Sequence, residues 1–190
     1  MILLLFSGGL DSMLLAERAA RSDTQLVTLF YRYPHPAAPE EYRAVSEWHR
    51  LKRLAGKQIR HIEISLPLWG TEQMDIGTGQ PGPRILPARN QVMISIAINI
   101  AASIGADCVM YGANADDNQE YVDCRPGWVQ TMDELARPWG ISISAPLLNQ
   151  TKQEIKAEAV QLGVSGWWSC YQPRDGHPCG TCDSCRAVIQ

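Results

Sequence analysis

The chain begins with an apolar run that passes directly into a glycine-rich string. Ile2 to Phe6 is uninterrupted by polar residues, and the next six residues, Ser7 to Ser12, read SGGLDS. A short apolar run of this kind is typical of a strand buried on both faces. The two glycines favour a tight turn, and helical spacing follows from Ser12 to Arg21. The first twenty residues therefore predict a buried strand, a close turn and a helix.

The same alternation continues along the chain. Further strands are expected at 25–31, 58–66, 107–112 and 141–147, and further helices at 40–55, 90–104 and 152–162. The helix at 90–104 is expected to be largely buried, and the stretch 75–83, rich in glycine and proline, to be a mobile loop. The helix at 152–162 is marked most clearly, because Thr151 and Glu154 form a capping box and Gly163 follows as a stop. This order predicts an α/β fold of the Rossmann-like, doubly wound type with a parallel sheet.

The string from Ser7 to Ser12 has the chemistry of an anion site. Glycines let the backbone approach a phosphate closely, and the amides at a helix N-terminus face it. The hydroxyls of Ser7 and Ser12 can donate to phosphate oxygens, whereas Asp11 fits a helix cap or a contact through Mg²⁺. The string is neither a Walker A loop nor a dinucleotide fingerprint, because the required Lys and third glycine are absent. A plain Gly-Gly turn is the alternative interpretation.

Four cysteines near the C-terminus are spaced for metal binding. Cys170, Cys179, Cys182 and Cys185 follow the pattern C-x8-C-x2-C-x2-C. No signal peptide or membrane-spanning run is found, so we expect a cytoplasmic protein, and in a reducing compartment such a cluster favours a metal over disulfides. Four thiolates close a tetrahedral shell, which indicates a structural Zn²⁺ site. Cys108 is interpreted as a small core residue.

Three polar segments lie where packing alone does not need them. The first contains Arg89 and Asn90, and Arg89 can hold a phosphate or a carboxylate with two parallel hydrogen bonds; a surface salt bridge is the alternative. The second follows a predicted strand, at the edge where α/β proteins bind ligands, and an ordinary turn is its alternative. The third, 121–126, is polar and aromatic, and a loop with a helix beginning at Pro126 is its alternative. The candidate site residues of the last two segments are Gly112, Asn114, Asp116, Tyr121, Asp123 and Arg125.

Taken in order, these segments resemble the 7-cyano-7-deazaguanine synthase (QueC) family. SGGLDS resembles the PP-loop of ATP pyrophosphatases, and the remaining counterparts are 87–90, 112–116, 121–125, 146–147, 151–154 and 168–171 together with the cysteine spacing. The resemblance implies an adenine nucleotide alpha-hydrolase-like domain at 1–168 and a zinc-binding segment at 169–190. It also implies an ATP-dependent ligase that converts 7-carboxy-7-deazaguanine and ammonia to 7-cyano-7-deazaguanine, with ATP and Mg²⁺ required, in a homodimer.

The resemblance also assigns roles to residues. Catalytic roles fall to Ser7, Asp11, Ser12 and Arg89. Nucleotide contacts are expected from Phe6, Ser7, Gly8, Gly9, Leu10, Asp11, Ser12, Arg89, Asn90 and Gly112. Contacts with the deazapurine substrate are expected from Asn114, Asp116, Tyr121, Asp123 and Arg125, and metal ligation from the four cysteines.

The chain departs from the family pattern at several positions. Where the family has a Tyr-Gly-Gln segment, this chain has Tyr31-Arg32-Tyr33 followed by prolines. Ala88 replaces the glycine of the family's PGRN motif, and Val122 replaces the proline of its YPDCR motif. These departures leave open an enzyme that stops at the amide or passes the adenylated deazaguanine to another acceptor. A non-catalytic nucleotide-binding module is the alternative outside enzymes.

Net charge bears on the remaining alternatives, which are sulfur transfer to tRNA, lysidine synthesis and NAD synthesis. The formal net charge is −3 and no basic stripe is present, which disfavours a nucleic-acid partner. Sulfur transfer needs an exposed cysteine pair, and only Cys108 and Cys124 lie outside the cluster. We therefore expect a small-molecule substrate and neither a nucleic acid nor a membrane as partner.

Overall fold

The sheet at the centre of the computed structural model is entirely parallel. The structure describes residues 1–68 and 86–189. The strand order is β3-β2-β1-β4-β5, with neighbours in parallel register from Ile2 opposite Leu26 to Cys108 opposite Ser142. The strands are β1 (Ile2–Leu5), β2 (Leu26–Arg32), β3 (Arg60–Ser65), β4 (Cys108–Met110) and β5 (Ser142–Ser144).

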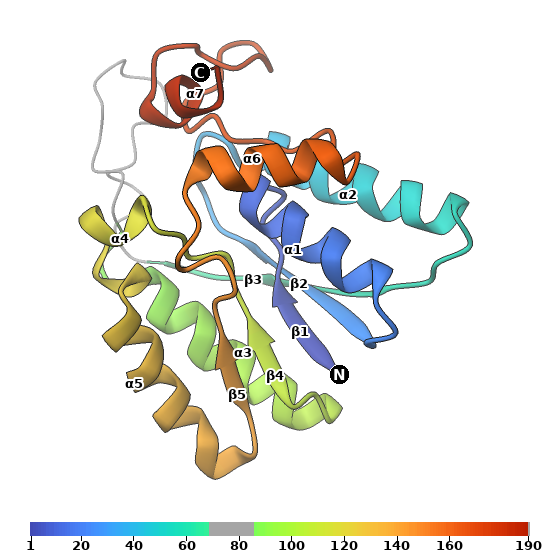
Figure 1. Cartoon of the computed structure of the whole chain (residues 1–190), viewed down its shortest axis with the longest axis vertical. Helices are drawn as coiled ribbons and strands as arrows, with labels where there is room; N and C mark the ends of the chain where they lie inside the picture. The colour runs from blue at the N-terminus through green and yellow to red at the C-terminus, as the bar shows by residue number, and fades with distance from the viewer. Residues whose placement is uncertain (69–85, 190) are drawn as a thin grey trace.

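Two helical layers cover the sheet. On one side lie α1 (Leu10–Arg21), α2 (Ala38–Leu54) and α6 (Lys152–Gln161), and on the other lie α3 (Arg89–Ile104) and α5 (Pro126–Ala136) (Figure 1). The remaining elements are α4 (Asp117–Glu120), α7 (Asp183–Ile189) and the 3-10 turns Val122–Cys124 and Arg137–Trp139.

The apolar run at the N-terminus forms β1, and its side chains pack into the hydrophobic cores on both faces of the sheet. Side chains alternate between the faces of a strand, so neighbouring residues of β1 enter different cores. Leu3 packs with the α3 and α5 side, whereas Leu4 packs with the α1, α2 and α6 side, and neither is exposed to solvent. A strand with apolar residues on both faces is thereby fixed at the middle of a covered sheet.

The strand order places a switch point beside β1. The chain runs outward from β1 through β2 to β3, then returns and adds β4 on the opposite side of β1. Helices that follow β1 and β4 consequently lie on different faces of the sheet, and a crevice opens at the carboxyl ends of these two strands. Ser7 follows β1 and Gly112 follows β4 at this edge. The predicted doubly wound fold is confirmed.

Several local predictions need correction. The predicted helix at 90–104 was expected to be largely buried, but α3 buries one face only, with Met93, Ile94, Ala97 and Ala101 inside and Val92 exposed. A helix that lies on one side of a sheet has only one face to bury. Cys108 is half-buried rather than a core residue, because β4 is short and lies near the sheet edge.

Other predictions held or fall outside the description. The capping box of Thr151 and Glu154 is present at α6, and the helix beginning at Pro126 is α5. The helices α4 and α7 had not been predicted, since each is short. The expected loop at 75–83 lies outside the described residues. No described helix combines the length and the apolar character that a membrane crossing needs.

Candidate active site and metal cluster

The glycine-rich string wraps the carboxyl end of β1 and begins α1. Gly8 has a φ of +82°, and a Cβ at this position would lie 2.9 Å from the Glu41 carbonyl oxygen. Only glycine fits a backbone that is both left-handed and pressed against α2. Gly9 occupies the N-cap position of α1, and no side chain caps that terminus. The first amides of α1 are therefore available to an anion.

Two serine hydroxyls lie beside these amides. Ser7 Oγ is 3.3 Å from Ser12 Oγ and accepts a hydrogen bond from the Gly9 amide at 3.4 Å. Ser12 Oγ donates to the Gly9 carbonyl at 3.0 Å. Ser12 is buried and Ser7 is exposed, so one hydroxyl holds the turn and the other faces the space in front of it. This arrangement offers hydrogen-bond donors of the kind that bind phosphate oxygens in other proteins.

A cluster of charges lies next to the loop. Asp11 Oδ2 accepts hydrogen bonds from Lys152 Nζ at 2.5 Å and from Asn114 Nδ2 at 3.3 Å. Asp117 Oδ2 accepts from Asn114 Nδ2 at 2.5 Å and lies 3.5 Å from Lys152 Nζ. The other oxygen of Asp11, Oδ1, is buried and has no hydrogen-bond partner in the described structure. Residues from α1, α4 and α6 and from the segment after β4 thus meet at one point.

The pKa shifts in this cluster have opposing causes. Burial raises the pKa of Asp11, and its contacts with Lys152 and Asn114 act against that rise. Burial acts to lower the pKa of Lys152, but the charges of Asp11 and Asp117 outweigh it and raise that pKa. Lys152 is therefore held as an ammonium ion between two carboxyl groups.

Arg89 faces the same space from the α3 side. Its NH1 donates to the Tyr33 hydroxyl at 3.2 Å, and the Tyr33 ring stacks on His35 with the ring centroids 4.5 Å apart. His35 Nε2 in turn lies 3.4 Å from a carboxylate oxygen of Glu41. Burial acts to lower the pKa of Arg89, yet the pKa is raised through the neighbouring Tyr33, Glu41 and Asp123. Arg89 therefore presents a charged guanidinium with further donors toward the cavity.

These groups line one cavity of about 940 Å³. This volume lies at the upper end of the range for ligand pockets in proteins. Most residues predicted for the nucleotide and the substrate line it, namely Phe6, Ser7, Gly9, Leu10, Asp11, Ser12, Arg89, Asn90, Gly112, Asp116, Tyr121 and Asp123.

Three predicted residues are not among the described lining residues. Gly8 lies behind the loop against α2. Asn114 is completely buried and holds Asp11 and Asp117 in place. Arg125 is exposed, and its Nε donates to the Asn118 carbonyl at 3.3 Å.

Lys152 and Asp117 were missed by sequence reasoning. Both line the cavity, yet Lys152 is 141 residues from Asp11 in the chain. One signal was available: Lys152 is the first residue of a helix, where a cation is unfavourable because the helix dipole is positive at that end.

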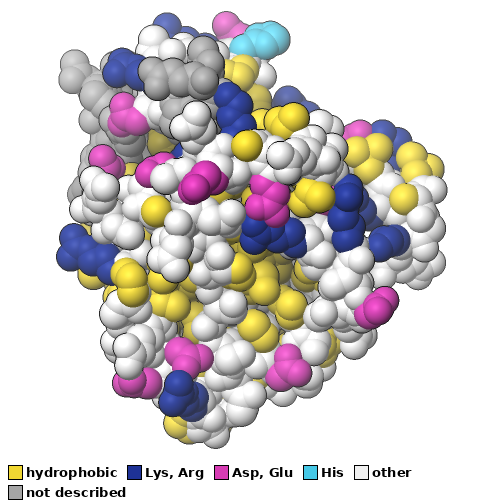
Figure 2. Space-filling view, viewed as in Figure 1, with side chains coloured by type: hydrophobic (Ala, Val, Ile, Leu, Met, Phe, Trp, Pro, Cys, Tyr) yellow, Lys and Arg dark blue, Asp and Glu magenta, His cyan; other side chains and the backbone are white. Residues whose placement is uncertain are grey.

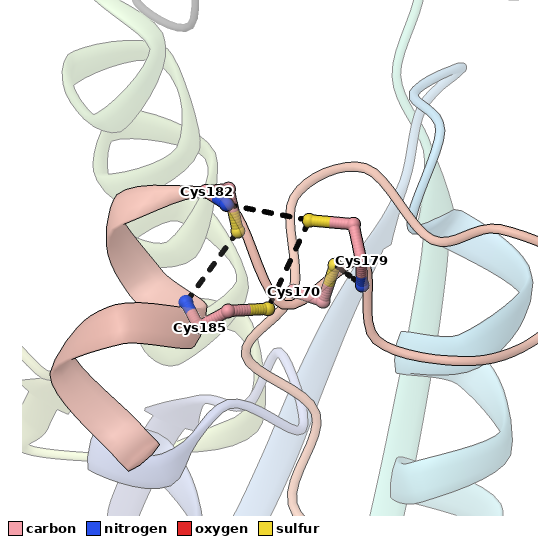
Figure 3. A group of neighbouring side chains, drawn as sticks. All are labelled: Cys170, Cys179, Cys182 and Cys185. Atoms are coloured by element: carbon pink, nitrogen blue, oxygen red, sulfur yellow. Dashed lines mark hydrogen bonds between the residues drawn. The ribbon is translucent and has the colours of Figure 1, made fainter. Parts of the chain in front are cut away.

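The four cysteines converge as their spacing predicts. Cys185 comes from α7, Cys182 from directly before it, and Cys170 and Cys179 from loops, and their sulfurs point toward one another (Figure 3). All four sulfurs lie within 4.8 Å of one another, and Cys179 Sγ is 3.9 Å from Cys185 Sγ. Four thiolates around one tetrahedral Zn²⁺ would be about 3.8 Å apart, given a Zn–S bond of about 2.3 Å.

Backbone amides support this cluster. The amides of Cys179, Cys182 and Cys185 donate to the sulfurs of Cys170, Cys179 and Cys182 at 3.2, 3.4 and 3.4 Å, respectively. Such N–H···S contacts stabilise thiolates. The donor set and its geometry fit a bound metal ion.

The cysteine segment also forms part of the cavity wall. The Trp168 amide donates to the Gly8 carbonyl at 2.8 Å, and Trp168 Nε1 donates to the Cys170 carbonyl. Ser169, Tyr171, Asp183 and Ser184 all line the cavity. The cysteine cluster and the glycine-rich loop are consequently joined by two hydrogen bonds through Trp168.

Comparisons with known proteins agree with this geometry. The family model "Queuosine biosynthesis protein QueC" matches residues 1–188. A 7-cyano-7-deazaguanine synthase of Microcystis aeruginosa is 37% identical, over 97% of this chain and 87% of that protein. The protein with the same description from Ralstonia pickettii is 35% identical, over 97% of this chain and 90% of that protein.

Solved structures share the fold at lower identity. The U34-tRNA thiolase NcsA from Methanococcus maripaludis, solved with its [4Fe-4S] cluster, has a TM-score of 0.59 and 14% identity, over 99% of this chain and 63% of that chain. A 4-thiouridine synthetase solved with RNA and bound ATP has a TM-score of 0.61 and 19% identity, over 94% of this chain and 45% of that chain. At these identities the likeness establishes the fold alone.

Proposed function

The chain belongs to the QueC family, and on this premise we propose that it converts 7-carboxy-7-deazaguanine and ammonia to 7-cyano-7-deazaguanine at the expense of ATP. The observation that carries the proposal is the position of the SGGLDS loop. It lies at the switch point of the sheet, with uncapped amides at the start of α1, and opens into the cavity of about 940 Å³. A cavity of this size can take a nucleotide together with a purine-like substrate.

The reaction needs a leaving group that a carboxylate lacks. We propose that a carboxylate oxygen of the substrate attacks the α-phosphorus of ATP, so that an O–P bond forms and pyrophosphate leaves with the electron pair of the broken bond. Ammonia then displaces AMP to give the amide, and a second adenylation, on the amide oxygen, permits loss of AMP and two protons to give the nitrile. Catalysis of this kind depends on positioning and on charge neutralisation.

The residue roles follow from the contacts. The amides of α1 with Ser7 and Ser12 would hold the pyrophosphate portion of ATP, and the unpaired Oδ1 of Asp11 would bind Mg²⁺, which prefers carboxylate oxygens. Arg89 would bind a carboxylate or phosphate, with Phe6, Gly9, Leu10, Asn90 and Gly112 around the nucleotide. Asp116, Tyr121 and Asp123 lie where they would contact the deazapurine, with Asn114 behind them and Arg125 outside.

For the cysteine cluster we propose a structural Zn²⁺ held by Cys170, Cys179, Cys182 and Cys185. All four positions of a tetrahedral ion would be filled, so the metal would supply folding energy rather than chemistry. The segment 169–190 is accordingly a metal-organised unit attached to the domain 1–168. Elemental analysis should find about one zinc per chain, whereas iron with sulfide and a brown colour would indicate an iron–sulfur cluster.

The substrate is proposed to be a small molecule and not a nucleic acid. On the face drawn in Figure 2, Lys and Arg side chains are scattered among Asp and Glu and form no continuous basic surface. The net charge of −3 also disfavours a polyphosphate backbone. A homodimer in the cytoplasm is proposed from the family resemblance, and sedimentation analysis of the purified protein would establish the oligomer.

A product assay tests the proposed function. The protein is incubated with 7-carboxy-7-deazaguanine, ATP, Mg²⁺ and ammonium, and the products are read by mass spectrometry. We expect the nitrile, AMP and pyrophosphate from the natural chain and at least about a hundredfold less from Asp11→Asn. Amide alone would mean that the second adenylation is lost. Intact ATP would contradict the proposed function and favour a nucleotide-binding module.

A further inference from the structure

The cavity contains few cations for a site that is to hold ATP. Among the described residues that line it, seven carry carboxyl groups, whereas Arg89 and Lys152 alone carry Lys or Arg charges. The acidic set is Asp11, Glu41, Asp116, Asp117, Glu120, Asp123 and Asp183. Phosphates in such surroundings need a cation in contact with them. Arg89 is bound to Tyr33, whereas Lys152 is bound to Asp11 of the loop itself.

Lys152 is placed against the local preference of its helix. It is the first residue of α6, where the helix dipole disfavours a positive charge. The helix does not need it as a cap, because Thr151 and Glu154 already form a complete capping box. A residue that breaks a local rule in a cavity, and that its helix does not need as a cap, indicates a function.

The position of Lys152 is fixed by the surrounding helices. Its amide donates to Asp116 Oδ2 at 2.8 Å, which ties the start of α6 to the segment after β4. Further along, Arg18 of α1 donates from Nε to Glu158 of α6 at 2.6 Å, and its NH2 bonds Gln150 at 3.0 Å. The start of α6 is therefore held against α1, which supplies Asp11. A rigid mount of this kind is what a catalytic side chain requires.

Lys152 also lies between two parts of the site. Asp11, on one side of its Nζ, belongs to the phosphate loop, and Asp117, on the other side, begins α4 beside the residues proposed to bind the deazapurine. In ATP the α-phosphate carries the phosphorus that is attacked, so during adenylation it lies between the departing pyrophosphate and the attacking substrate. A cation between the loop and the substrate residues is thus located for the α-phosphate.

We infer that Lys152 is a catalytic residue that exchanges its contact with Asp11 for the α-phosphate of ATP during adenylation, with Asp117 as its positioning residue. The inference rests on the proposed function of the cavity. When the carboxylate oxygen bonds to the α-phosphorus and the bond to the pyrophosphate oxygen breaks, charge gathers on the nonbridging oxygens. The ammonium stays protonated and donates hydrogen bonds to them, and Asp11 is released to hold Mg²⁺.

The test compares three variants, each with one substitution in α6. Lys152→Gln keeps donors toward Asp11 and Asp117 but removes the charge, Lys152→Arg restores the charge, and Lys156→Gln makes the same change one turn later, outside the described cavity lining. Pyrophosphate formation is measured in a single turnover with enzyme in excess. We expect Lys152→Gln to be slower by about a hundredfold, Lys152→Arg to recover at least about tenfold, and Lys156→Gln to stay within about twofold.

Binding supplies a second readout that does not depend on turnover. By calorimetry, Lys152→Gln should bind α,β-methylene-ATP about tenfold more weakly, because one charged contact to the α-phosphate is lost, yet bind pyrophosphate within about twofold of the natural chain. The number of analogue molecules bound per chain shows that the variant is folded. Full binding of both probes together with turnover within about threefold of the natural chain would overturn the role of Lys152.

The two proposals fail in different ways. If the natural chain gives no product from 7-carboxy-7-deazaguanine, the proposed substrate is wrong. The analogue binding then still decides Lys152, since that measurement contains no deazapurine. If the natural chain makes the nitrile and Lys152→Gln makes it equally fast, the proposed function stands and the role of Lys152 is contradicted.

Discussion

At the residue scale, Gly112 and Asp11 are packed as closely as Gly8 and α2. A Cβ built on Gly112 would lie 2.9 Å from the Asp11 Cβ and 3.4 Å from the Ser12 amide nitrogen. Real Cβ atoms do not approach this closely, and here the obstacles are a short side chain and backbone rather than a flexible tip. Gly112 follows β4, on the far side of the switch point from the loop. The loop and the β4 end therefore fit together only because this position has no side chain.

Gly112→Ala should accordingly displace Asp11 and impair turnover. We expect ATP-dependent pyrophosphate formation to fall at least about tenfold, and the free energy of unfolding to fall by about 1–3 kcal/mol, as in other overpacked sites. Gly127→Ala is the matched control, because a Cβ at Gly127 meets nothing within 4 Å and Gly127 is helical. That variant should be as active as the natural chain. Equal activities for the two variants would show that the Asp11 position tolerates a shift.

The site residues that could be predicted from the sequence are those that belong to a local motif. The SGGLDS loop and the four cysteines are contiguous or regularly spaced, so their chemistry was predicted without a fold. Lys152 and Asp117 gain their meaning from Asp11, which is more than a hundred residues away from each, and no local pattern reports such a contact. Ala88 was only partly understood from the sequence, which showed that it replaces a glycine of the family pattern. The structure explains why the family has glycine there, because the backbone at Ala88 is left-handed, with a φ of 56°.

At the element scale, the cysteine cluster holds one wall of the cavity. Trp168 links the Cys170 carbonyl to the Gly8 carbonyl, and residues on both sides of the cysteines line the cavity. The segment is short, and its own regular structure is the helix α7 and one isolated bridge between Arg174 and His177. So small a unit buries little apolar surface of its own, and the Zn²⁺ proposed for it would supply the missing folding energy.

Loss of one metal ligand should therefore weaken nucleotide binding from a distance. Cys182→Ser is expected to lose most of the bound metal and to bind α,β-methylene-ATP at least about tenfold more weakly, because the wall from Trp168 to Ser184 is no longer held. Metal content is read by elemental analysis and affinity by calorimetry. Cys108→Ser on β4 is the matched control and should retain both. A metal-free Cys182→Ser protein with unchanged affinity would separate the cluster from the site.

At the scale of the whole molecule, the edge of the sheet is held by a polar contact inside the core. The Thr28 hydroxyl of β2 is completely buried and lies 2.9 Å from His49 Nε2 of α2 and 2.8 Å from His61 Nδ1 of β3. The two imidazole rings are 4.5 Å apart between centroids. Three elements thus share one hydroxyl, and this arrangement joins the edge strand β3 and the helix α2 to the centre of the fold.

The contact works with neutral imidazoles. Burial, together with the neighbouring His61 and Arg53, lowers the pKa of His49 to about 4. Burial also lowers the pKa of His61, although Glu63 acts in the opposite direction. A free histidine titrates near pH 6.5. Between that pH and about 4 His49 consequently binds more protons in the unfolded chain than in the folded one, and its contribution to the free energy of unfolding falls as the pH is lowered through this window.

Substituting His49 should flatten this dependence on pH. The free energy of unfolding is measured by urea titration between pH 7.5 and 4.5 for the natural chain and for His49→Gln, whose amide can still bond Thr28. We expect the natural chain to be more stable at pH 7.5, and its advantage to shrink by about 1–2 kcal/mol toward pH 4.5, a figure reduced for the partial exposure of the ring. Acid release of the metal affects both proteins and cancels in the difference. An advantage that stays constant across the window would mean that His49 keeps an ordinary pKa in the folded protein, and the acid sensitivity of the fold would then have to arise elsewhere.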